Sequence, residues 1–201
     1  ALLASYEIER RPVAVRNVAR SDRHANVHVT WRSQMDRTLL EAETPEGAAH
    51  RARIDRIIQT ERGENEDHGI ELGYRYDGSP VIVAEAGDAP AWTPRTYTPT
   101  TWPGGRPPSV ILGDGSFLFD RFGSGFTLLD FTDDPEASRL VAAASARGVP
   151  VERVVIRDAR ARGLYERNLV LIRPDQHVAW RGDHVPADPL GIVDRVRGIA
   201  Q

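Results

Sequence analysis

Strand-length apolar runs alternate with helical segments in the second half of the chain, and this succession constrains the fold more than any other feature. The predicted strands are residues 126–131, 151–156, 168–172 and 178–181, and the predicted helices are 134–147, a short stretch before the third strand, and 188–199. Gly148 stands where a helix C-cap is expected. The order is strand, helix, strand, helix, strand, strand, helix.

A strand–helix–strand pair implies parallel pairing with a right-handed crossover, and the final hairpin adds an antiparallel edge. The apolar strands 126–131 and 151–156 are both expected to be buried, the first in a sheet interior covered on both faces. This succession is the one that thioredoxin-like domains use. The chain has no cysteine, and Phe131–Pro135 stands where the dithiol would be. We therefore interpret the domain as a redox-silent structural or interface module.

The first half has a different character. Residues 1–59 are helical in composition; Pro12 is expected to kink or break the first helix, and Thr44 to cap a cleaner one that ends near Gln59. Two short strands joined through Asp77-Gly78 are expected within residues 72–83. Two further short strands are expected at 110–112 and 117–118.

Residues 87–108 are rich in proline and glycine and are predicted to be an extended linker. The predicted division is therefore 1–86, 87–108 and 109–201, an α/β chain whose last part is the thioredoxin-like domain. Ala1–Arg10 has the composition of a helix interior, with no capping residue before it. We expect that the helix begins in upstream sequence and that the chain is a fragment.

Charge and hydropathy exclude several classes of partner. The net charge of −3 gives no electrostatic basis for binding nucleic acid or an anionic membrane. No apolar run approaches the ~20 residues of a membrane helix. The N-terminal sequence is not that of a signal peptide, so a cytoplasmic location is expected.

Four groups of residues are candidates for a site. Tyr74 and Tyr76, which flank an arginine, could line a substrate pocket shared with another domain, or could form the buried face of a plain strand. His24 and His28 have the four-residue spacing of helical metal ligands, but no third ligand follows at a recognisable spacing, so a solvated helix surface is the favoured interpretation and no metal is predicted.

Asp133 and Asp134 could act as paired carboxylates in acid–base chemistry, but one capping the following helix and the other favouring its positive end is the preferred interpretation. Trp92, Tyr97 and Trp102 are expected to anchor the proline-rich segment by burying large apolar area.

Four stretches resemble the C-terminal region of class A FAD-dependent aromatic-ring monooxygenases, in the branch of phenol, polyketide and 3-(3-hydroxyphenyl)propionate hydroxylases. They are LLASYEIERRPV (2–13), LGYRYDGSPVI (72–82), the stretch from Pro94 through PGGRPP (103–108) to FGSGFTLL (122–129), and LIRPDQHVAWRG (171–182). Together they cover most of the chain in the family's order. The resemblance implies an intact enzyme that uses FAD and NAD(P)H to hydroxylate a phenolic or polyketide ring.

The resemblance also implies partners: the missing N-terminal FAD-binding portion and, through the thioredoxin-like domain, a second copy in a homodimer. The family's glycine-rich dinucleotide fingerprint and its later Gly-Asp motif are both missing from this chain. No catalytic or cofactor-binding residue is therefore carried over. The alternative is a free-standing, redox-inactive thioredoxin-like binding or dimerisation module.

Overall fold

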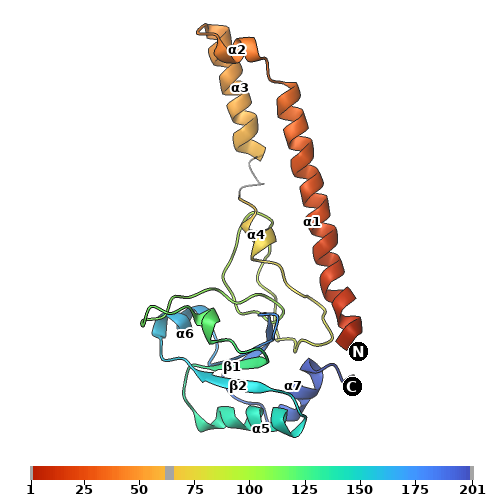
Figure 1. Ribbon diagram of the computed structural model, residues 1–201, viewed down its shortest axis with the longest axis vertical. Helices are drawn as coiled ribbons and strands as arrows, with labels where there is room; N and C mark the ends of the chain where they lie inside the picture. The colour runs from red at the N-terminus through yellow and green to blue at the C-terminus, as the bar shows by residue number, and fades with distance from the viewer. Residues whose placement is uncertain (1, 62–65, 200–201) are drawn as a thin grey trace.

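The computed structural model describes residues 2–61 and 66–199 and shows an elongated molecule, with a helical arm at one end and an α/β module at the other (Figure 1). The arm contains α1 (Leu2–Ser33), α2 (Arg37–Glu41) and α3 (Pro45–Glu61), and α4 (His68–Glu71) follows. The module contains the strands β1 (Phe126–Asp130), β2 (Val151–Val155), β3 (Leu169–Ile172) and β4 (Val178–Gly182). Its helices are η2 (Leu118–Arg121), η3 (Pro135–Ala137), α5 (Ser138–Ala146), α6 (Ala159–Tyr165) and α7 (Pro189–Val196).

The four strands form one mixed sheet in the order β2-β1-β3-β4. β1 pairs with β2 in parallel, and the pairs β1–β3 and β3–β4 are antiparallel. This is the crossover followed by a hairpin that the element order predicts, so the thioredoxin-like α/β fold is confirmed.

The sheet lies between two layers. Leu128 points to the side that α5 and α7 cover, where Leu140 and Val193 pack. The next residue, Leu129, points to the opposite side, where Tyr165 of α6 packs. Both leucines are fully buried, which confirms β1 as an interior strand covered on both faces. β2 lies at the edge of the sheet and is only partly buried, so the expectation of a second buried strand was wrong.

The first helix corrects the expectation of a break, because α1 runs through Pro12 as one helix, whereas a kink there stays a prediction. Proline removes one backbone hydrogen bond, but side chains before and after it are held by the same packing surface. Ser5, Glu9 and Val13 are all buried against the rest of the chain. The predicted second helix is confirmed as α3, and the Thr44 hydroxyl accepts a hydrogen bond from the Gly47 amide at its start. None of the helices within residues 2–61 and 66–199 is long and apolar enough to cross a membrane.

The short strands expected within 72–83 and at 110–118 do not form; each region makes a single β-bridge. The backbone amide of Tyr76 donates to the carbonyl of Gly104 instead of pairing within a local hairpin. Pro80 cannot donate, which limits pairing in that stretch. Residues 110–118 make one tight turn with Ile111 opposite Phe117.

Residues 87–108 contain no helix or strand, yet they pack closely against the module. The amide of Val178 in β4 donates to the carbonyl of Gly105, and the amide of Gly104 donates to the carbonyl of Val178. The amide of Val83 donates to the carbonyl of Ala179. The outer edge of β4 is thus covered by preceding sequence. The division into residues 1–86, 87–108 and 109–201 stays a prediction.

The end of β1, where thioredoxins carry their dithiol, is a closed polar cluster. The Asp130 carboxylate is fully buried and accepts hydrogen bonds from the backbone and hydroxyl of Thr132 and from the Arg153 guanidinium. Asp134 accepts from the Glu136 amide and so caps η3, which confirms capping by one of the two aspartates. Asp133 adopts a left-handed backbone (φ 59°) and pairs with Arg153 and Arg157.

Asp130 makes the folded state sensitive to acid. Burial alone would raise the pKa of Asp130, but the hydrogen bonds from Thr132 and Arg153 outweigh burial and hold that pKa below its usual value. The stability that this carboxylate contributes is therefore present above its unfolded pKa of about 3.9 and is lost as the pH falls through the folded pKa.

We expect Asp130→Asn to lower the free energy of unfolding by about 2–3 kcal/mol at pH 7, because Arg153 loses the closer and buried one of its two carboxylate partners. Between about pH 5 and pH 3 the variant should lose stability less steeply than the wild type. Urea titrations at several pH values check this, with the exposed Asp88→Asn as the control that should keep the wild-type slope. An unchanged slope in Asp130→Asn would contradict the assignment.

Candidate functional site

The arm joins the module through a buried carboxylate. Glu9 of α1 is 5% exposed, and its Oε1 accepts hydrogen bonds from Arg173 Nη1 at 2.5 Å and from the Ser79 hydroxyl at 2.6 Å. Its Oε2 accepts from Arg173 Nη2 at 3.0 Å. Arg173 lies in the turn between β3 and β4, so one bidentate ion pair connects residues 164 positions apart.

Tyr74 and Tyr76 lie beside this ion pair. The ring of Tyr76 stacks on His177 at a centroid distance of 4.3 Å, and Tyr74 is tilted against Tyr76 and His177 at 5.8 and 5.4 Å. The Tyr76 hydroxyl accepts a hydrogen bond from Arg10 of α1 at 3.1 Å. We call the six residues Glu9, Arg10, Tyr74, Tyr76, Arg173 and His177 the junction cluster.

The electrostatics of the junction cluster favour a neutral tyrosine beside charged arginines. Burial raises the pKa of Tyr76, and the Arg10 guanidinium opposes this only partly. Burial alone would lower the pKa of Arg173, but its hydrogen bond to Glu9 leaves that pKa raised. At neutral pH Tyr76 is therefore a hydrogen-bonding and packing group, and its phenol is a poor general base.

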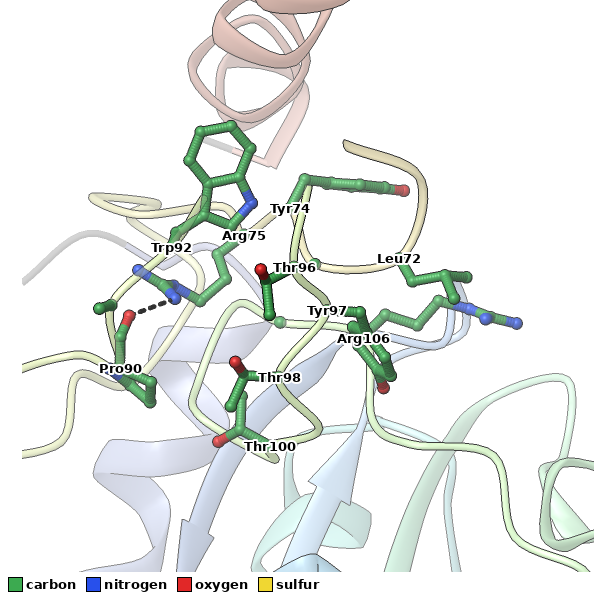
Figure 2. Close-up of a pocket in the computed structure, with 13 residues that line it drawn as sticks. Leu72, Tyr74, Arg75, Pro90, Trp92, Thr96, Tyr97, Thr98, Thr100 and Arg106 are labelled. Atoms are coloured by element: carbon green, nitrogen blue, oxygen red, sulfur yellow. Dashed lines mark hydrogen bonds between the residues drawn. The ribbon is translucent and has the colours of Figure 1, made fainter. Parts of the chain in front are cut away.

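A small cavity adjoins Tyr74 (Figure 2). Trp92, Tyr97 and Arg106 also line it, and its volume is about 20 Å³. A space of that size holds about one water molecule and excludes an aromatic ring. The sequence predicted for Trp92 and Tyr97 only a role in anchoring the proline-rich segment. The substrate-pocket role of Tyr74 and Tyr76 stays a prediction.

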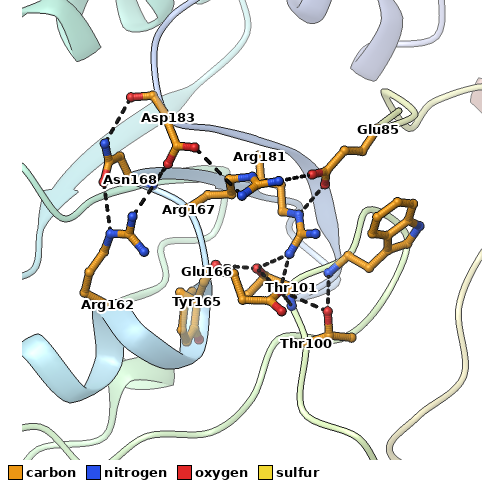
Figure 3. Close-up of polar contacts among 11 residues, drawn as sticks. Glu85, Thr100, Thr101, Arg162, Tyr165, Glu166, Arg167, Asn168, Arg181 and Asp183 are labelled. Carbon is orange, nitrogen blue, oxygen red and sulfur yellow. Dashed lines mark hydrogen bonds and ion pairs between the residues drawn. The ribbon is translucent and has the colours of Figure 1, made fainter. Parts of the chain in front are cut away.

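A second polar network fastens the proline-rich segment to the module (Figure 3). The side chain of Arg181 in β4 is 5% exposed and pairs with both Glu85 and Glu166. Arg181 also donates to the Thr101 hydroxyl at 3.0 Å, and Glu85 accepts from Arg167 at 2.5 Å. The only local signal for this network was an arginine in a predicted strand, and its partners come from distant segments.

The remaining candidates do not assemble into a reactive centre. His24 lies 3.1 Å from the Asp67 carboxylate, which also pairs with Arg20. Within residues 2–61 and 66–199, no group of three or more histidine or carboxylate side chains could hold a metal ion.

The turn after β1 does not fit the pyrophosphate of FAD. The one strand–helix–strand unit with parallel strands in the described sheet leads from β1 into η3 through residues 131–134, which contain two aspartates and no glycine. A pyrophosphate needs glycines and open amides at that turn, and carboxylates would repel it.

The junction ion pair should dominate the attachment of the arm. We expect Glu9→Ala to lower the free energy of unfolding by about 3 kcal/mol, because Arg173 loses its buried bidentate partner and keeps only Asp175, whose side chain is 41% exposed. The double variant Glu9→Ala/Arg173→Met should recover part of that loss. Urea unfolding of the four cycle members checks this, with Glu41→Ala, which breaks an exposed pair with Arg37, as a control that leaves the midpoint unchanged. Equal midpoints for Glu9→Ala and Glu41→Ala would contradict the buried pair.

The chain is similar to the C-terminal part of known aromatic-ring hydroxylases and monooxygenases. Residues 100–198 match the model described as aromatic-ring hydroxylase, C-terminal. The chain is 34% identical over 192 residues to the FAD-dependent monooxygenase opdD of Penicillium oxalicum, covering 92% of this chain and 36% of that protein. It is 29% identical over 220 residues to phenol 2-monooxygenase of a Pseudomonas species, covering 94% and 36% respectively. The chain thus spans about a third of these relatives.

Two solved structures of flavin enzymes resemble this chain over nearly its whole length. The rebeccamycin biosynthetic enzyme RebC, with reduced flavin, superimposes with a TM-score of 0.84 at 35% identity over 99% of this chain and 37% of that one. The flavin-dependent monooxygenase PieE, in complex with FAD and substrate, gives a TM-score of 0.85 at 28% identity over 100% of this chain and 40% of that one. The chain belongs to the family of FAD-dependent aromatic-ring hydroxylases and corresponds to their C-terminal region.

Proposed function

We propose that this chain is the C-terminal portion of an FAD- and NAD(P)H-dependent monooxygenase that hydroxylates a phenolic or polyketide aromatic ring. The observation that carries this is the match of nearly the whole chain to about a third of each relative, among them a phenol monooxygenase. FAD carries the oxygen chemistry in such enzymes. Because residues 131–134 do not suit a pyrophosphate, the upstream portion would bind it.

The role of this portion is structural. The end of β1 is filled by the Asp130–Arg153 pair in place of a redox group. The junction cluster offers buried ion pairs and stacked rings rather than a nucleophile beside a cavity of substrate size. These contacts hold the arm rigidly against the module, which would present α1 to the flavin-binding portion in a fixed orientation.

The activity is tested on the polypeptide that includes the upstream portion. The purified protein should carry FAD with its visible absorption bands and oxidise NAD(P)H faster when a phenol or polyketide phenol is added. Under ¹⁸O₂, one ¹⁸O atom should enter the ring of the product. A polypeptide without FAD, or substrate-independent consumption of NAD(P)H with no ring product, would contradict the function. A complete reading frame limited to this chain would favour the free-standing binding module.

Homodimerisation through the thioredoxin-like domain is also proposed. β4 has its outer edge covered by residues 83 and 104–105, but β2 is an edge strand and is only partly buried. Unpaired strand edges are common sites of association. Light scattering of the polypeptide with its upstream portion should give twice the chain mass, and a concentration-independent monomer mass would contradict the proposal.

A further inference from the structure

The helix α1 has two faces of different character. One face buries Ser5, Glu9 and Val13. Seven large apolar residues of the helix remain in solvent. Three of them, Leu2, Leu3 and Tyr6, lie in its first turns, and the other four are Ile8, Val15, Val18 and Val29, with exposed fractions of 47, 62, 70 and 67%. At 3.6 residues per turn these four fall within an arc of about 80° on the side opposite the buried face. Arg11 and Asp22 fall in the same arc and interrupt the apolar stripe with charge. An exposed apolar face of this kind marks a contact surface.

A shallow depression of about 660 Å³ lies along this part of the helix. Ile8, Pro12, Val15 and Ala19 provide its apolar lining, and its charged lining residues are Glu7, Arg11 and Arg16. The volume is sufficient for several side chains of a neighbouring element.

Arg16 contributes a charge that no carboxylate contacts directly in the described residues, and Asp77 acts on it only from a distance. Its Nε and Nη2 atoms are buried and have no hydrogen-bond partner in the part of the chain that the structure describes. The guanidinium stacks 4.6 Å from the ring centroid of Trp92, and burial lowers the pKa of Arg16. Two other arginines of the helix are satisfied, since Arg10 donates to Tyr76 and Arg20 pairs with Asp67. A partly desolvated cation at the wall of an apolar depression fits a carboxylate.

We propose that the stripe and depression of α1 dock the upstream portion of the same polypeptide, and that an acidic side chain of that portion pairs with Arg16. The occupant follows from length: this chain spans only 24–39% of its curated relatives, and it matches their C-terminal region. About two thirds of each relative therefore has no counterpart here. The inference rests on the proposed function and adds the docking surface and the chemistry of its partner.

The test is hydroxyl-radical footprinting of the polypeptide that includes the upstream portion. The oxidation rate of each side chain is divided by its rate in the urea-unfolded polypeptide. Ile8 and Ile111 form a matched pair, because they are the same residue and are 47% and 55% exposed in this chain. Docking predicts that Ile8, Val15 and Val18 react at least about fivefold more slowly than Ile111. Equal rates for Ile8 and Ile111 would overturn the docking surface. Protection that disappears on dilution would identify a second copy as the occupant and also overturn it.

Charge variants test the acidic partner. Arg16→Gln and Arg16→Glu should raise the oxidation rate of Ile8 at least about twofold, because the docked portion is held less tightly. Arg16→Lys should raise that rate less, because lysine keeps the charge. Arg37→Gln, on an arginine whose side chain is 91% exposed in α2, is the matched control and should leave the rate unchanged. Wild-type protection in both Arg16→Gln and Arg16→Glu would overturn the pairing. If FAD is bound but Ile8 is unprotected, the docking proposal fails and the proposed function stands. If Ile8 is protected but FAD and turnover are absent, the proposed function fails and the docking proposal stands.

Discussion

The buried ion pair between Glu9 and Arg173 is the contact on which the arrangement of the two parts depends. Without it, α1 would meet the module mainly through Val13 and the two tyrosines, a small apolar patch. A bidentate pair removed from water fixes direction as well as distance, because the planar guanidinium donates its two hydrogen bonds to the carboxylate in one orientation. Ser79 completes the coordination of Glu9 and fixes the turn after Tyr76. The arm is therefore oriented by polar geometry more than by apolar area.

The proline-rich segment illustrates how an irregular chain becomes part of a rigid structure. It has no helix or strand, but it hydrogen-bonds to the edge of β4, and Thr101 fastens it to Arg181 and Glu166. Such a segment satisfies its backbone groups through partners elsewhere in the chain. It also covers an edge that would otherwise be open to association, and leaves β2 as the partly buried edge of the sheet.

The module keeps the thioredoxin-like fold while its reactive position has been converted to a structural one. Asp130, fully buried, organises the backbone after β1 through Thr132 and Arg153. Fold and function are separate here, because the sheet requires only the order and burial of its strands, whereas the chemistry requires specific side chains at the end of β1. The same separation of fold and function applies to FAD. The chain is homologous to FAD-dependent hydroxylases, yet the turn after β1 does not suit the pyrophosphate of FAD.

The sequence by itself determined the succession of elements in the module, because apolar runs of strand length and the capping residues Thr44, Asp134 and Gly148 are local signals. It also identified the family, through motifs spread along the chain. It did not determine the continuity of α1 through Pro12, the edge position of β2, or the pairing of Tyr76 with Gly104 rather than with a nearby strand. Nor did it reveal Glu9–Arg173 or the Arg181 network. These depend on residues far apart in sequence, and no local pattern records which distant partner satisfies a buried charge or a backbone amide once the chain has packed.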